Sequence, residues 1–277
     1  LITPLTQPPC PKLQRALTTL DEGEEWLLEP QMSDDNPQLW SPGIKLGIQP
    51  GSFFHQTECF GPVLGLMRAT TLDEAISLAN ATAYGLTSGI HSLDDREVTY
   101  WKVRIQAGNA YINRHITGAI VRRQPFGGWK ASVVGPGAKA GGPNYVLQLL
   151  QWHQLERPTQ HAELPSSLIL LLEHCLEQMP DKRAWELLRA SAHSYAWAWQ
   201  THFSQEHDPS QVLGESNIFR YRPCRGIVLR VGAYATALAV AQVLLAVRTC
   251  GQPLTISIAP QEEAQWSWLT EELNVFV

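Results

Sequence analysis

The feature that most constrains the fold of this chain is an alternation of short apolar runs with amphipathic helical segments. In the segment TLDEAISLANAT, residues 71–82, Thr71 suits an N-cap, acidic residues occupy the first turn, and apolar residues recur at helical spacing. Apolar runs flank it on both sides. Repeated strand and helix predicts an α/β fold. The expected strands lie in 62–69, 85–92 and 109–113, and the expected helices in 71–82 and 94–105.

The second half of the chain is richer in helical patterns. LILLLEHCLEQM (168–179) and the segment 183–203 predict two helices, and the latter repeats large apolar residues at spacings of three and four. A run ending at Val231, a helix over 234–248 and the run LTISIA (254–259) then predict a βαβ unit, the elementary piece of a parallel sheet. The positions expected to face the core of the second helix are Trp185, Leu188, Ala192, Tyr195 and Trp199.

These patterns suggest three parts: a first domain over 1–150, a helical connector over 151–215 and a Rossmann-like domain over 216–277. The first fifty residues are rich in Pro and turn residues, with a short helix over 12–20 and a polar loop. The chain begins without Met and ends at NVFV, where an apolar strand is expected to start. We therefore expect it to be a fragment, with the last domain truncated.

Composition excludes several classes of protein. With 44% hydrophobic and 17% charged residues the chain is an ordinary globular protein, and a net charge of −5 without a basic stripe excludes a nucleic-acid partner. The 5 cysteines contain no CxxC pair, so we expect neither a disulfide framework nor a zinc site, and a cytoplasmic location. No apolar run is long enough for a signal sequence or a membrane span, so membrane association is not expected.

Three short motifs follow one another in the first domain. TECFGPVL (57–64) precedes AGNAYINR (107–114) by about fifty residues, and QPFGGWKAS (124–132) comes next. Each motif alone predicts only a turn or a loop. In this order and spacing they resemble the second half of the aldehyde dehydrogenase superfamily.

That resemblance implies a cofactor site at Glu58 and Phe60. In the family, the carboxylate of Glu-x-Phe-Gly-Pro accepts hydrogen bonds from the ribose beside the nicotinamide of NAD, and the aromatic residue two positions on packs beside the nicotinamide ring. An ionised carboxylate binds two vicinal hydroxyls well, and a flat ring orients another. A solvated loop carboxylate is the alternative for Glu58.

A second resemblance narrows the substrate. ITGAIVRRQPFGG (116–128) and KAGGPNYVLQLL (139–150) are similar to the L-glutamate γ-semialdehyde dehydrogenases, including those fused behind a flavin-dependent proline dehydrogenase. The resemblance implies that backbone N–H groups of Gly118 and Ala119 bind the α-carboxylate of this small-molecule substrate, with Phe126 as the aromatic wall of the aldehyde channel. Gly118 permits the close approach because it has no Cβ.

Some residues depart from this pattern or leave alternatives open. Trp129 stands where relatives have a small residue. Arg122 and Arg123 either assist an anionic substrate or are ordinary surface arginines. Gly232 is the single glycine of a turn in which a dinucleotide fingerprint has three, so the last βαβ unit is expected to be structural.

No cysteine of the chain matches the family's nucleophile. That thiolate lies in a Gly-x-Cys context before the Glu-x-Phe-Gly-Pro element, whereas Cys10 follows Pro-Pro and Cys59 lies inside the ribose motif. We expect the nucleophile and the general base upstream of Leu1, and no activity from this chain alone. The histidines of the helical middle show no metalloprotease spacing, so no metal site is expected.

Two alternatives remain open beside NAD-dependent oxidation of L-glutamate γ-semialdehyde. One is an aldehyde dehydrogenase of broad specificity, and the other is a non-catalytic scaffold or oligomerisation piece. The resemblance also implies a homo-oligomer, and it implies FAD only if a proline dehydrogenase domain precedes the chain.

Overall fold

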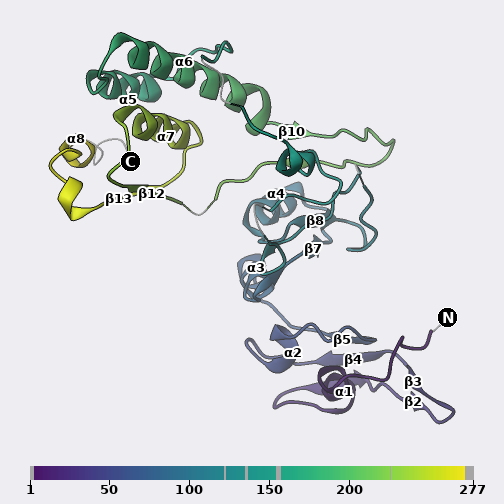
Figure 1. Ribbon diagram of the computed structural model, residues 1–277. Coiled ribbons are helices and arrows are strands. Elements are labelled where there is room, and N and C mark those ends of the chain that lie inside the picture. The colour runs from purple at the N-terminus through teal and green to yellow at the C-terminus, as the bar shows by residue number, and fades with distance from the viewer. Residues whose placement is uncertain (1–2, 122, 135–136, 154–156, 225, 272–277) are drawn as a thin grey trace. The chain divides into compact units, whose positions relative to one another are not determined.

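The computed structural model describes residues 3–121, 123–134, 137–153, 157–224 and 226–271. The chain divides into two units, residues 1–150 and 151–277 (Figure 1). Each unit has buried clusters of its own, so each is described by itself. Arg122, and the strand expected at residues 274–277, lie outside the described residues.

The first unit contains short strands interleaved with short helices. Its elements are α1 (Pro11–Thr18), β1 (Glu25–Leu28), β2 (Met32–Ser33), β3 (Asn36–Trp40), β4 (Gly43–Leu46), α2 (Phe53–Gln56), β5 (Val63–Gly65), α3 (Leu72–Asn80), β6 (Tyr84–Gly85), β7 (Thr87–Ile90), α4 (Asp95–Arg104), β8 (Asn109–Ile112), β9 (Trp129–Lys130) and the 3₁₀ turn η1 (Val146–Leu149).

The sheets of this unit are small. Strands β1, β4 and β5 form one sheet in which β4 is antiparallel to β1 and parallel to β5, and β7 pairs in parallel with β8. Thr71 caps α3 by accepting a hydrogen bond from the Glu74 N–H, and Asp94 caps α4. The strand and helix alternation expected over 62–113 is confirmed.

The first fifty residues differ from the expectation of a helix followed by a polar loop. Strands β3 and β4 occupy part of that loop, and Lys45 of β4 is only 2% exposed. Strand β4 has only four residues and contains a lysine, so its sequence shows no clear apolar alternation. It is recognised as a strand only from its pairing with β1 and β5 in the folded chain.

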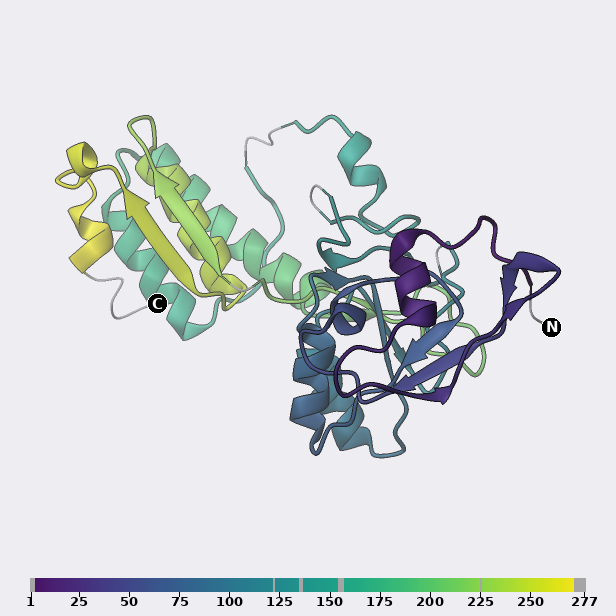
Figure 2. The same ribbon diagram turned by 90° about the horizontal axis from the view of Figure 1, so that it is seen from below.

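The second unit contains α5 (Ser166–Glu177), α6 (Lys182–Ala198), the π turn η2 (Trp199–Phe203), β10 (Glu206–His207), β11 (Phe219–Arg220), β12 (Ile227–Val231), α7 (Ala237–Thr249), β13 (Leu254–Ile258), the 3₁₀ turn η3 (Pro260–Glu262) and α8 (Ser267–Glu271). Strands β12 and β13 pair in parallel, and α7 connects them in the sequence, which confirms the βαβ unit. Helix α7 packs against α5 and α6, and these helices lie to one side of the strand pair (Figure 2).

One apolar cluster joins the helices to the βαβ unit. Leu171 of α5, Leu188 of α6, Leu244 of α7 and Val231 of β12 are all buried in it. The region expected to be a connector therefore shares the core of the region expected to be a Rossmann-like domain.

Trp185 is a correction to the predicted core of α6. Its side chain is 38% exposed, while Leu188 and Ala192 are fully buried. Trp185 and Leu188 are three positions apart, and only the second faces α7. Among the described residues, none of the helices combines the length and the apolar character needed to cross a bilayer.

Candidate functional site

Glu58 and Phe60 lie in the short segment between α2 and β5. Between them, Cys59 is buried in a cluster with Leu13 and Trp40. The Cys59 side chain packs into this cluster, whereas the side chains of Glu58 and Phe60 stay outside it. Phe60 is 81% exposed and Glu58 is also exposed.

Residues of α1 fix the backbone of this segment. The Lys12 ammonium donates a hydrogen bond of 2.7 Å to the Glu58 carbonyl oxygen. At Gly61 a Cβ atom would lie 2.1 Å from a methyl carbon of Leu13, so the α1 packing requires glycine there. Phe60 adopts φ of 58°, a left-handed conformation that is rare for an aromatic residue.

The Glu58 carboxylate is available to a ligand. Across the described part of the chain it makes no hydrogen bond or ion pair within the protein. An exposed carboxylate beside an exposed aromatic ring can accept hydrogen bonds from hydroxyls and present a flat apolar face. The residues therefore fit a nicotinamide ribose, the group that the sequence resemblance implies.

Gly118 and Ala119 lie in the loop that follows β8. The loop leaves the sheet at Asn113, whose φ is 55° and whose side-chain amide donates to the Ser92 carbonyl and accepts from the Ser92 N–H. Gly118 is exposed with φ of 87°, and Ala119 is half-buried. The loop thus begins at the carboxyl end of a parallel strand, where ligands of α/β proteins commonly bind.

Phe126 lies further along the same segment and is 43% exposed. Its N–H and carbonyl pair with Ala140 at 3.2 and 3.0 Å. The side chain of Asn109, at the start of β8, donates to the Pro125 carbonyl and accepts from the Gly127 N–H. Both neighbours of Phe126 are therefore tied to β8.

Lys139 adds a second tie to the same turn. Its ammonium donates to the carbonyl oxygens of Gly108 and Gly127 and to Oδ1 of Asn109. Burial without a carboxylate partner lowers the pKa of Lys139 to about 8. Asn109 and Lys139 both lie in the quoted motifs, yet the sequence analysis assigned them no role, since the convergence of their acceptors is a tertiary property.

The predicted site residues thus form two groups within the first unit. Gly118, Ala119 and Phe126 share the segment after β8, and Glu58 and Phe60 share the segment before β5. Arg123 belongs to the turn in which its N–H donates to the Ile120 carbonyl.

Three thiols of the chain do not resemble an activated nucleophile. Burial raises the pKa of Cys59 and of Cys250, and it raises the pKa of Cys175 to about 12. A raised pKa reduces the thiolate fraction at neutral pH. No cluster of three or more potential metal ligands occurs among the residues with described positions.

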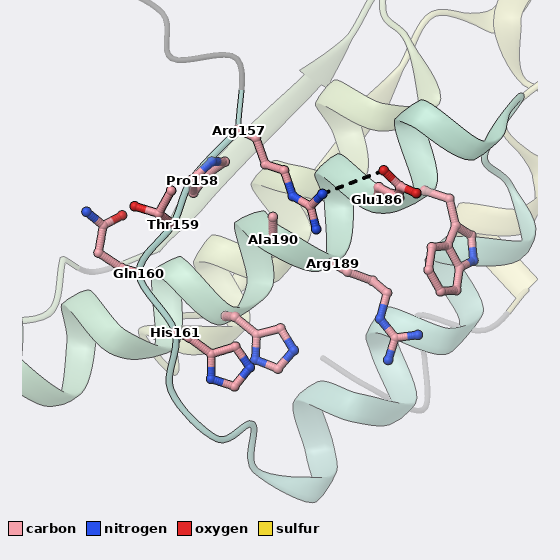
Figure 3. Close-up of a pocket in the computed structure, with 10 residues that line it drawn as sticks. Arg157, Pro158, Thr159, Gln160, His161, Glu186, Arg189 and Ala190 are labelled. Carbon is pink, nitrogen blue, oxygen red and sulfur yellow. Dashed lines mark ion pairs between the residues drawn. The ribbon is translucent and has the colours of Figure 1, made fainter.

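A depression of about 660 Å³ lies in the second unit, between residues 157–161 and α6 (Figure 3). The rings of His161 and His193 stack with centroids 4.0 Å apart, and Arg157 pairs with Glu186 at 3.6 Å. None of the predicted site residues lines it. It is an open depression and not part of the candidate site.

Comparison with known proteins gives a consistent result. A family profile described as "Aldehyde dehydrogenase family" matches residues 12–155. The bifunctional protein PutA of Rhizobium meliloti is 45% identical over 118 residues, which are 42% of this chain and 9% of that protein. A 1-pyrroline-5-carboxylate dehydrogenase of Bacillus pumilus is 41% identical over 120 residues, 43% of this chain and 23% of that protein.

A solved structure extends the likeness to nearly the whole chain. The structure of proline utilization A (PutA) from Corynebacterium freiburgense is 43% identical with a TM-score of 0.79, and the match covers 96% of this chain and 28% of that one. The chain therefore spans less than a quarter of the two curated relatives and little more than a quarter of this structure.

Proposed function

Since the chain belongs to the aldehyde dehydrogenase family, which its residues 12–155 match, we propose that the whole protein oxidises L-glutamate γ-semialdehyde to L-glutamate with NAD⁺ in proline degradation. The similar proteins named 1-pyrroline-5-carboxylate dehydrogenase and PutA support this substrate, since pyrroline-5-carboxylate is the cyclic form of the semialdehyde. Within this reaction the chain contributes cofactor and substrate contacts.

The observation that carries the proposal is the pair of exposed side chains on either side of buried Cys59. The unpartnered carboxylate of Glu58 accepts hydrogen bonds from the two hydroxyls of a ribose. Phe60, 81% exposed and held in a left-handed conformation, sets the orientation of a neighbouring flat ring. When bound, NAD⁺ supplies the hydride acceptor.

The loop after β8 supplies the substrate contacts in this proposal. Gly118 and Ala119 donate their backbone N–H groups to the α-carboxylate, and Phe126 forms a wall that excludes water from the aldehyde end. Fixing both ends of the substrate orients its carbonyl for attack. The family's reaction requires a thiolate nucleophile, and the raised pKa values of Cys59, Cys175 and Cys250 support a role for this chain in binding only.

Assembly, location and further cofactors complete the proposal. Exposed apolar residues such as Leu149 and Trp152 support a homo-oligomer, and five free cysteines support a reducing cytoplasm. FAD belongs to this proposal only if a proline dehydrogenase domain precedes the chain in the whole protein, an arrangement compatible with the similarity to a bifunctional protein.

The test is turnover by the whole protein with two aldehydes. NADH formation is measured with L-glutamate γ-semialdehyde and with propanal under the same conditions. We expect a much larger kcat/KM for the semialdehyde because propanal has no carboxylate to bind the loop. Equal values would favour a broad-specificity aldehyde dehydrogenase, and no turnover of either would favour a scaffold.

A further inference from the structure

Lys139 has an unusual set of partners for a largely buried cation. Its ammonium donates to the Gly108 carbonyl at 2.5 Å, to Asn109 Oδ1 at 2.9 Å and to the Gly127 carbonyl at 2.9 Å. None of these acceptors is a carboxylate. An ammonium has three N–H donors, so the three contacts use its full capacity.

The three acceptors join two segments that are distant in sequence. Asn109 is the first residue of β8 and Gly108 directly precedes it, whereas Gly127 follows Phe126. The segments approach so closely that a Cβ atom on Gly108 would lie 1.9 Å from the Gly127 carbonyl oxygen. Without a donor between them, these carbonyl dipoles would face one another unpaired in a partly buried space.

The contacts of Lys139 and Asn109 leave Phe126 little freedom. Asn109 holds the Pro125 carbonyl and the Gly127 N–H, Ala140 pairs with both backbone groups of Phe126, and Lys139 holds the Gly127 carbonyl. A side chain that is itself 43% exposed is thereby fixed through its backbone. These hydrogen bonds fix the backbone on both sides of its Cα.

We propose that Lys139 is a positioning residue that fixes Phe126 as the wall of the aldehyde channel. This inference rests on the proposed function, because it assigns the purpose of the turn to substrate binding. Lys139 does not touch the substrate. It acts by joining the start of β8 to the turn that carries the aromatic ring.

Protonation and shape explain why lysine suits this position. Burial lowers the pKa of Lys139 to about 8, so at neutral pH most molecules still carry the protonated ammonium with its three donors. The planar guanidinium of arginine presents its donors as a fork and does not match three acceptors converging on one point. Methionine has similar length and no donor.

The first experiment measures hydrogen exchange in the whole protein and needs no activity. Lys139→Met should speed exchange of the Phe126 and Gly127 amides by at least about tenfold, because loss of a charged hydrogen bond loosens the turn. Lys130→Met is the matched control. Lys130 also donates to two backbone carbonyls, but these belong to Asn80, the last residue of α3, and to Thr82 just after it.

In the control variant, the exchange rates of the Phe126 and Gly127 amides should stay within about twofold of wild type. Such a change is well below the one expected from the loss of one hydrogen bond. Unchanged exchange in Lys139→Met, or equal acceleration in both variants, would overturn the positioning role. This result stands whether or not the whole protein oxidises the semialdehyde, so failure of the proposed function is seen separately as absent turnover.

The second experiment separates positioning from general destabilisation. In Lys139→Met, kcat/KM for the semialdehyde should fall at least about tenfold, mainly through KM, while the Kd for NAD⁺ stays within about twofold. In Lys139→Ala, added propylammonium chloride should restore part of the loss, whereas the same concentration of sodium chloride should not. Equal weakening of NAD⁺ binding, or no rescue by the amine, would contradict the proposal.

Discussion

At the scale of single residues, the candidate site is marked by backbone conformations that most side chains avoid. Phe60 and Asn113 have φ of 58° and 55°, and Gly118 has φ of 87°. The first lies in the proposed ribose segment and the other two in the loop after β8. Strained conformations persist only where the surrounding structure fixes them, and here Lys12, Leu13 and Ser92 supply that support.

The proposed role of Glu58 is tested by the substitution Glu58→Gln in the whole protein. The amide keeps the shape but replaces a charged acceptor with a neutral one, and hydrogen bonds to charged groups are about twice as strong. We expect a loss on the order of 1–3 kcal/mol, observed as slower hydride transfer and a higher KM for NAD⁺. Wild-type values for both constants would exclude Glu58 as the ribose ligand.

Gly118→Val tests the substrate loop. Among the described residues, a Cβ atom at position 118 would meet His115 Nε2 alone, at 3.8 Å. The expected loss therefore comes from a blocked approach to the backbone N–H groups and from a positive φ that favours glycine. Activity towards the semialdehyde should fall at least about tenfold, or about 1.4 kcal/mol, and propanal turnover much less.

The matched control is Gly51→Val, because Gly51 has φ of 80° and open space around its Cα. This variant measures the backbone penalty of a β-branched residue in a left-handed conformation without touching the loop. If Gly118→Val reduced turnover of both aldehydes equally, or if Gly51→Val lowered semialdehyde turnover as much, then Gly118 would only support the fold.

The lowered pKa of Lys139 predicts a pH dependence of stability. In the folded chain this pKa is about 8, below its ordinary value of 10.5, so the unfolded chain binds more protons between these values. The contribution of Lys139 to the free energy of unfolding therefore rises from pH 8 to 10.5 and is lost as pH falls through 8. The difference in stability between wild type and Lys139→Met should shift in favour of wild type over this range, and a constant difference would contradict the lowered pKa.

At the scale of elements, a buried ion pair links Lys45 of β4 to Glu24, the residue directly before β1. Lys45 and Glu24 have side chains only 2% and 1% exposed, their charged atoms lie 3.1 Å apart, and Lys45 also donates to the Thr19 carbonyl. Removing one partner of a buried pair leaves an uncompensated charge, which is more harmful than removing both.

Lys45→Met should therefore lower the opening free energy of the β1 and β4 amides by about 3–5 kcal/mol, measured by hydrogen exchange. The double change Lys45→Met with Glu24→Leu should recover most of this loss. Lys182→Met removes one partner of an exposed pair with Glu186 and should leave stability nearly unchanged. A double variant as unstable as the single one would show that packing around Lys45, and not charge, decides the effect.

At the scale of the whole molecule, we propose that the chain contributes binding segments and not the thiolate nucleophile. Burial raises the pKa of three of its cysteines, and Cys10 and Cys224 are exposed. We predict that the 277-residue chain alone does not form NADH from any aldehyde. Steady NADH formation that a Cys10→Ser or Cys59→Ser change abolished would refute this.

The sequence by itself determined the local elements and predicted the candidate site. Thr71 predicted the start of a helix because capping depends on neighbouring residues only, and the order of three motifs predicted Glu58, Phe60, Gly118, Ala119 and Phe126 as the candidate site. Only the tertiary structure revealed strand β4 with its buried Lys45, the exposure of Trp185, and the common core of α5, α6 and the βαβ unit. It also revealed Lys139 as the tie between β8 and Phe126. These features depend on contacts between residues that are far apart in the sequence. Such contacts form only on folding, so a local sequence pattern does not predict them.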